Sequence, residues 1–145
     1  MIKNEKQYRI TKAQVRRFQD AIAELAGQER PSNISPRLWH AQRQAAQSQM
    51  EELQEQVQAY ERLHLGKSKE VVLEAVEDLP KALIRARIAA GMTQEGLARR
   101  LGVKPQQVQR YEATDYESAS FARILKVVQA LGLTMPEAVR LVRSG

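Results

Sequence analysis

The sequence contains no cysteine among its 145 residues, and this absence excludes disulfide bonds, thiolate chemistry and cysteine-bound zinc. No apolar run approaches the roughly 20 residues that a membrane-crossing helix needs, so we expect no membrane partner. The first ten residues, MIKNEKQYRI, are polar from the third onward and do not resemble a secretory leader. What is present, 43% hydrophobic and 28% charged residues, is the composition of a globular chain. We therefore expect a cytoplasmic globular protein.

The excess of basic charge lies in the second half of the chain. Residues 1–78 hold 12 Lys and Arg residues against 12 Asp and Glu residues, whereas residues 79–145 hold 11 against 5. The net charge of +6 therefore belongs to residues 79–145. A basic module of this kind favours a polyanion as its partner, and the alternative is a solvated basic surface that only aids solubility.

The first predicted helix begins near Thr11. Thr11 and Gln14 form a T-x-x-Q pattern that is typical of a capping box, in which each side chain binds a backbone group at the start of a helix. Gly27 is placed to end the helix. Apolar residues recur between these points at the spacing of one helical face, namely Val15, Phe18, Ile22 and Leu25.

The second predicted helix begins with Ser35 and Pro36 and runs to about Leu65. It carries a seam of apolar side chains with coiled-coil spacing that includes Trp39, Met50, Leu53, Val57 and Tyr60. Two helices with complementary stripes and a short connection predict an antiparallel hairpin over residues 1–65. The seam could close within this hairpin, or it could face a second copy of the chain or a different protein.

Residues 66–78 are predicted to connect the hairpin to the rest of the chain. Val71, Val72 and Leu73 favour an extended conformation, so a short strand is possible near residues 71–76. A single strand needs a partner edge, which would come from the N-terminal residues or from a second subunit. The alternative is an ordered linker without a strand.

Residues 79–145 are predicted to form an all-helical domain of four or five short helices. Thr93 is placed to cap the second of them, and a third begins near Lys104 with Pro105 in its first turn. Val108 and Tyr111 are spaced to face inward on that third helix. Its outward and flanking positions are then polar, with Gln106, Gln107, Gln109 and Arg110.

The stretch RIAAGMTQEGLARRLGVKPQQVQRYE resembles the Cro/repressor-type, or Xre-type, helix-turn-helix family across roughly residues 79–134. It keeps the Gly-hydrophobe-Thr-Gln opening, the Leu-Ala pair of the second helix, the Leu-Gly-Val turn and the glutamate that closes the recognition helix. Gly96 stands where a better helix former is usual, which should loosen the second helix by up to roughly 1 kcal/mol. The resemblance implies a domain that binds double-stranded operator DNA, usually as a homodimer.

The resemblance also implies roles for individual residues. Base contacts would come from Gln106, Gln107, Gln109 and Arg110, because Gln can bind adenine and Arg can bind guanine bidentately in the major groove. Arg87 and Glu112 match positions that form a structural salt bridge. Asp115 and Glu117 stand in a loop where such repressors often carry basic residues, so contacts from this loop would be neutral. The implied contacts with the DNA backbone involve Thr93, Gln94, Lys104, Tyr116, Ser118 and Ser120.

The plan of the whole chain is similar to that of HigA-type antitoxins of bacterial toxin–antitoxin systems. This similarity implies a repressor that regulates its own operon and captures a toxin protein through a region outside the helix-turn-helix. One alternative is a standalone or phage-derived regulator without a toxin, and another is a protein-interaction adaptor whose helix-turn-helix no longer reads DNA. The acidic clusters lack a nearby nucleophile, phosphate loop or metal-ligand set. We therefore expect no enzyme activity, cofactor or metal site.

Overall fold

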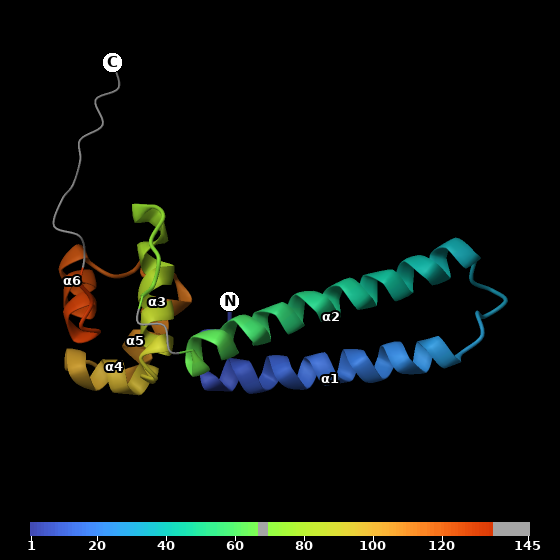
Figure 1. Ribbon diagram of the computed structural model, residues 1–145, viewed down its shortest axis with the longest axis horizontal. Helices are drawn as coiled ribbons and strands as arrows, with labels where there is room; N and C mark the ends of the chain where they lie inside the picture. Colours follow the sequence, from blue (N-terminus) through green and yellow to red (C-terminus); the bar gives the residue numbers. More distant parts are fainter. Residues whose placement is uncertain (67–69, 135–145) are drawn as a thin grey trace, which may run out of the picture. The chain divides into compact units, whose positions relative to one another are not determined.

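The computed structural model describes residues 1–66 and 70–134, and regular structure in this part of the chain is helical throughout (Figure 1). The described residues form six α-helices and one short 3₁₀ turn, and they contain no strand. Contacts divide the chain into two compact units, Met1–Ser68 and Lys69–Gly145. The prediction of an all-α protein that begins with a helical hairpin is confirmed. None of the described helices has both the length and the apolar character that crossing a membrane requires.

Helix α1 spans Glu5–Gly27 and begins earlier than the T-x-x-Q pattern predicts. Asn4 is the N-cap, and its side chain accepts a hydrogen bond from the backbone N–H of Gln7 at 2.9 Å. The side chain of Gln7 in turn accepts from the backbone N–H of Lys3 at 2.8 Å. Asn4 and Gln7 therefore supply the reciprocal capping that was expected of Thr11 and Gln14. The predicted start at Thr11 is wrong, because Thr11 lies inside the helix.

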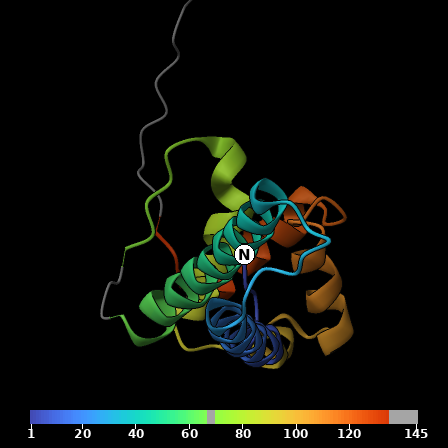
Figure 2. The ribbon, with the colours of Figure 1, turned by 90° about the vertical axis from the view of Figure 1, so that its right-hand side faces the viewer.

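Helix α2 spans Pro36–Leu65 and has the predicted bounds. Ser35 is its N-cap, and the Ser35 side chain accepts from the backbone N–H of Leu38 at 3.2 Å. Pro36 occupies the first turn, where a missing N–H costs no hydrogen bond. Figures 1 and 2 show α1 and α2 side by side as an antiparallel hairpin.

The hairpin packs most closely where α1 begins and α2 ends, which we call its closed end. Val15, Val57 and Tyr60 are the buried side chains of the two helices. The ring of Tyr60 stacks on Tyr8 at a centroid distance of 5.1 Å and on His64 at 5.8 Å. Burial of these rings and aliphatic groups is the main favourable free-energy term that this end contributes.

A polar network at the closed end sets the register of the two helices. The hydroxyl of Tyr8 donates to the Glu61 carboxylate at 2.6 Å. Lys12 Nζ donates to the Tyr8 hydroxyl at 2.7 Å and forms an ion pair with Glu61 at 3.2 Å. These hydrogen bonds to the charged form, first from Tyr8 and then from Lys12, lower the pKa of Glu61 below its ordinary value of 4.5.

The hairpin should lose stability as the pH falls and Glu61 takes up a proton. The pKa of Glu61 is lowered in the folded state, so the stabilisation is complete above the unfolded-state pKa and is lost as the pH falls through the lower, folded-state pKa. Thermal melting followed by circular dichroism, from neutral pH to about pH 3, should show this decline. Glu61→Gln should remove part of the decline, whereas Glu55→Gln, at an exposed position of the same helix, should keep it. Equal pH dependence in both variants would contradict the assignment.

The hairpin is less closely packed toward residues 28–35, which join the two helices and which we call its loop end. Figure 1 shows the helices diverging in this direction. A groove of about 410 Å³ lies between them, lined by Ile22, Leu25, His40, Arg43, Gln44 and Gln47. Trp39, Met50 and Leu53 of the predicted seam are only partly buried, whereas Val57 and Tyr60 are buried. The seam is therefore closed at one end only.

The segment before the second unit is not a strand. Residues 70–75 have no regular structure, and Val76–Asp78 form a 3₁₀ turn. The strand expected near residues 71–76 is therefore absent from the described residues, and the linker alternative describes this segment. An isolated apolar run forms a strand only against a partner edge, and the N-terminal residues that could have supplied one belong to α1 from Glu5 onward.

The second unit packs four helices around a small apolar core. They are α3 (Leu79–Ala89), α4 (Gln94–Leu101), α5 (Pro105–Ala113) and α6 (Phe121–Ala130). The core side chains with at most 1% of their surface exposed are Leu83, Ile84, Leu97, Ala98, Val108 and Val127. A side-chain hydrogen bond of 2.8 Å from Arg100 to the carbonyl oxygen of Ala130 joins α4 to the end of α6. The sequence also allows a short fifth helix over residues 136–142, which lies outside the described residues.

Candidate nucleic-acid interface

Helices α4 and α5 are joined by a tight turn whose local sequence explains its shape. Thr93 caps α4 by accepting from the backbone N–H of Gly96 at 3.0 Å. Gly102 ends α4 in the left-handed conformation, with φ of 68°, which a residue without a Cβ adopts readily. Lys104 is the N-cap of α5, and Pro105 occupies its first turn. The chain therefore passes from one short helix to the next within three residues, 102–104.

Helix α5 has one buried face and one exposed face. Val108 and Glu112 have no exposed surface and Tyr111 is 8% exposed, so the positions i, i+3 and i+4 face the core. Gln106, Gln109 and Arg110 are exposed, and Gln107 is partly buried. Gln106 and Arg110 are four residues apart and therefore lie one above the other on the exposed face.

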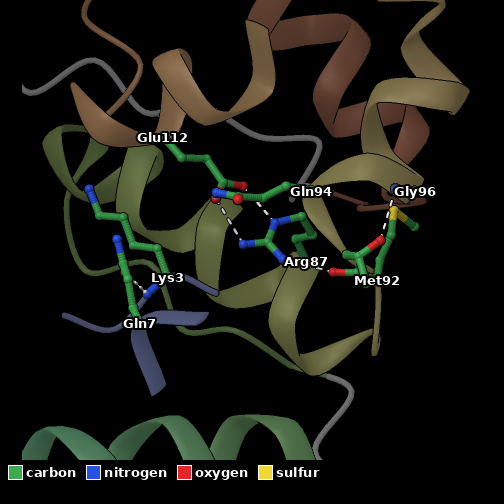
Figure 3. Close-up of polar contacts among 8 residues, drawn as sticks. Lys3, Gln7, Arg87, Met92, Gln94, Gly96 and Glu112 are labelled. Carbon is green, nitrogen blue, oxygen red and sulfur yellow. Dashed lines mark hydrogen bonds and ion pairs between the residues drawn. The ribbon is translucent and has the colours of Figure 1, made fainter. Parts of the chain in front are cut away.

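A buried polar cluster holds α5 against α3 and α4 (Figure 3). The guanidinium group of Arg87, on α3, donates to both carboxylate oxygens of Glu112, at 2.6 and 2.8 Å. Gln94, at the start of α4, donates its side-chain amide to the same carboxylate at 2.7 Å. A third Arg87 nitrogen donates to the carbonyl oxygen of Met92 at 2.7 Å. Arg87 is 3% exposed and Glu112 is fully buried.

This cluster contacts the buried face of α5 and thereby fixes the position of its exposed face. Charge-assisted bidentate hydrogen bonds are directional, so the Arg87–Glu112 pair restricts both rotation and sliding of α5. Gln94 and Met92 bring the beginning of α4 into the same network. A helix positioned in this way presents its outward side chains with little freedom, which favours recognition of a ligand of fixed shape.

Gln94 is placed differently from the sequence-based expectation of a contact with the DNA backbone. Its side chain is 9% exposed and donates to the buried carboxylate of Glu112. Sequence reasoning missed this role, because Gln94 and Glu112 are 18 residues apart and neither local periodicity nor capping links them. No local sequence pattern signals this contact, because it depends on how α4 and α5 pack together.

The remaining residues that were expected at the DNA backbone are exposed, with one exception. Lys104 is exposed at the start of α5. The hydroxyl of Thr93 caps α4, that of Ser120 accepts from the backbone N–H of Arg123 at 3.1 Å, and that of Ser118 lies 3.1 Å from the hydroxyl of Thr114. The hydroxyls of Thr93 and Ser120 therefore already act as helix caps.

Tyr116 is the exception, because its side chain is 2% exposed and does not reach the surface. It lies in the segment after α5, where Asp115 and Tyr116 both have positive φ, 46° and 62°. The backbone N–H of Tyr116 donates to the carbonyl oxygen of Tyr111 at 2.6 Å, and the two rings stack at 6.1 Å. The expectation that Tyr116 contacts phosphate is therefore corrected. The ring anchors the loop to the core, because burying an aromatic ring outweighs the free energy of exposing it for one hydrogen bond.

Tyr116→Phe should leave stability unchanged or raise it by up to about 1–3 kcal/mol. The hydroxyl of Tyr116 is buried and has no hydrogen-bond partner in the part of the chain that the structure describes. Burial, together with the Glu112 carboxylate, raises the pKa of this phenol far above its usual range. Removing an unsatisfied hydroxyl recovers a desolvation penalty of about 1–3 kcal/mol and leaves the ring in place. Chemical denaturation of both proteins checks this. A loss of more than about 1 kcal/mol in Tyr116→Phe would mean that the hydroxyl has a partner, such as an internal water.

Comparison with known families identifies this region. Residues 83–137 match the helix-turn-helix family, over a range that includes α4, α5, α6 and the larger part of α3. This region of the chain is a helix-turn-helix domain of the Xre/Cro type, and such a domain indicates a DNA-binding regulator. Comparisons with curated proteins and with solved structures return no match. The similarity of the whole chain to HigA-type antitoxins therefore has no support from these comparisons.

Proposed function

We propose that the protein is a sequence-specific transcriptional repressor that reads its operator with the exposed face of α5. The observation that carries the proposal is the division of this helix into two faces. Its buried face carries Glu112, whose pair with Arg87 of α3 positions the helix. Its exposed face presents the side chains of Gln106, Gln109 and Arg110.

The side chains on the exposed face suit the major groove of B-DNA. A glutamine amide can bind both N6 and N7 of adenine, and an arginine guanidinium can bind both O6 and N7 of guanine. Gln106 and Arg110 share one line of the helix and would meet neighbouring base pairs, with Gln107 and Gln109 at the flanks. Lys104, exposed at the start of α5, would meet a phosphate group. Specific operators usually consist of two half-sites, so we expect the repressor to bind as a homodimer.

We further propose that the repressor acts in the cytoplasm as the antitoxin of a type II toxin–antitoxin system. In support, the chain carries a separate helical unit, Met1–Ser68, in addition to its DNA-binding unit, and this unit offers a surface for a partner protein. The alternative is a standalone or phage-derived regulator. Co-purification with the product of an adjacent gene for a small basic protein would favour the antitoxin, and a neighbourhood without such a gene would favour the alternative.

The test of DNA reading is binding of the purified protein to the DNA upstream of its own gene and to an unrelated duplex of equal length. The affinity for the upstream DNA should be higher, and it should fall with salt along a log–log slope of about −0.9 per neutralised phosphate. Equal, weak binding to both duplexes would contradict sequence-specific reading. No binding to either duplex would instead favour a protein-interaction adaptor, in agreement with the acidic residues Asp115 and Glu117 after α5.

A further inference from the structure

The α1–α2 hairpin is a large helical surface with a small core. It contains helices of 23 and 30 residues, yet the only buried side chains in them are Val15, Val57 and Tyr60. Helices of this kind derive most of their stability from packing of their apolar faces, and the chain has no cysteine that could brace them with a disulfide. The hairpin therefore has apolar surface still to be covered.

This uncovered surface lies toward the loop end. Ile22 and Leu25 of α1 line the groove of about 410 Å³, and Trp39 and Met50 of α2 are only partly buried. These residues continue the seam that Val57 and Tyr60 close at the other end. Because the seam continues an interface that already exists, its natural occupant is another helix pair of the same kind.

The charges along the two helices are segregated in a way that makes the hairpin complementary to itself. Apart from Glu5 and Arg62, the first half of each helix is basic and its second half is acidic. Because α1 and α2 are antiparallel, the basic half of each helix lies beside the acidic half of the other. The residues that produce this pattern are Lys6, Arg9, Lys12, Arg16 and Arg17, then Asp20 and Glu24, on α1, and Arg37 and Arg43, then Glu51, Glu52, Glu55 and Glu61, on α2. The Lys12–Glu61 ion pair of 3.2 Å shows that antiparallel α1 and α2 do pair their opposite charges.

We propose that the hairpin binds a second copy of this chain through its seam, with α1 of one copy antiparallel to α2 of the other. This arrangement repeats between copies the charge pairing seen within one copy, whereas α1 beside a parallel α1 would place like charges together. The two hairpins would then form a four-helix bundle. Both loop ends lie at one end of this bundle, and the C-terminal ends of both α2 helices lie at the other end. The two DNA-binding units would then leave the bundle at the same end, as two adjacent half-sites require, and this last step rests on the proposed function.

The chain contains a built-in probe for this interface, because Trp39 is its single tryptophan and lies on the seam. Analytical ultracentrifugation of the full chain without DNA should give the mass of a dimer that dissociates on dilution. Trp39 emission should shift to longer wavelength over the same concentration range. A protein that stays monomeric at high concentration would overturn the proposal, and so would a dimer whose dissociation leaves Trp39 emission unchanged. Neither outcome depends on DNA reading, so failure here is distinct from failure of the proposed function.

A matched pair of variants locates the interface. Ala46 is partly buried on the seam, and Ser48, two residues later, is exposed on the opposite side of α2. Ala46→Glu should weaken self-association at least about tenfold, because it places an unpaired charge in the seam, whereas Ser48→Glu should not. Circular dichroism at a concentration where both variants are monomeric checks that each hairpin remains helical. Helical variants with equal dimer affinities would overturn the proposal, and loss of helix in Ala46→Glu leaves the Trp39 dilution experiment to decide.

Discussion

Glu112→Ala should lower the free energy of unfolding of the second unit by about 3–5 kcal/mol, which is the usual effect of removing one partner from a buried ion pair. The Glu112 carboxylate is fully buried and accepts hydrogen bonds from Arg87 and Gln94. Without it, the buried guanidinium of Arg87 loses its counter-charge in a medium of low polarity. Differential scanning calorimetry, which separates the transitions of two units, would measure the loss.

The control for this variant is Glu117→Ala, which removes an exposed acidic residue from the loop after α5. It should change the stability by no more than about 0.5 kcal/mol. Replacing both partners, as in Arg87→Met with Glu112→Leu, should recover much of the loss, because no buried charge then remains. An unchanged transition in Glu112→Ala would show that the pair does not stabilise the helix-turn-helix.

Arg110→Ala should relax base preference at one operator position by about 1–3 kcal/mol, the discrimination that one good bidentate contact supplies. The fold should be unaffected, because Arg110 is exposed on α5 and its side chain forms no hydrogen bond or ion pair with the other described residues. The measurement compares the affinity of wild type and variant for the operator and for a set of duplexes with single base-pair changes.

The control for this variant is Arg99→Ala, since the Arg99 side chain is 75% exposed on α4 and pairs only weakly with Glu95, at 3.9 Å. It should alter binding to all duplexes uniformly, if at all, because a residue that contacts only phosphate carries no sequence information. Retention of full base discrimination in Arg110→Ala would remove Arg110 from the reading surface.

Local sequence patterns predicted the start of a helix correctly where the capping residue was unambiguous. Ser35 and Pro36 marked the start of α2, and Thr93 marked that of α4, because a capping side chain acts within its own turn. The start of α1 was predicted wrongly, because Asn4, seven residues before Thr11, caps the helix instead. The sequence left open whether residues 71–76 form a strand or a linker, because strand formation depends on a partner edge that the local sequence does not reveal.

Parts of the candidate site depend on tertiary contacts that sequence patterns do not show. The burial of Tyr116 follows from two consecutive residues with positive φ, a conformation that Asp115 favours only weakly and Tyr116 does not favour. The family resemblance placed Gln94 at the DNA backbone, but its side chain instead donates to the buried carboxylate of Glu112, which belongs to another helix. The inward positions of α5 were predicted well, because the helical period alone determines them.

The ends of α5 have a consequence for how the protein can evolve. Lys104 and Pro105 fix its beginning, and at its end Thr114 donates to the carbonyl oxygen of Arg110 while Tyr116 donates to that of Tyr111. Because both ends of α5 are fixed in this way, the helix cannot lengthen or slide. The positions at which it presents side chains to a ligand are therefore constant. Substitutions at positions 106, 109 and 110 therefore do not require the interior to repack. Related proteins can acquire new operator preferences through single substitutions at these positions.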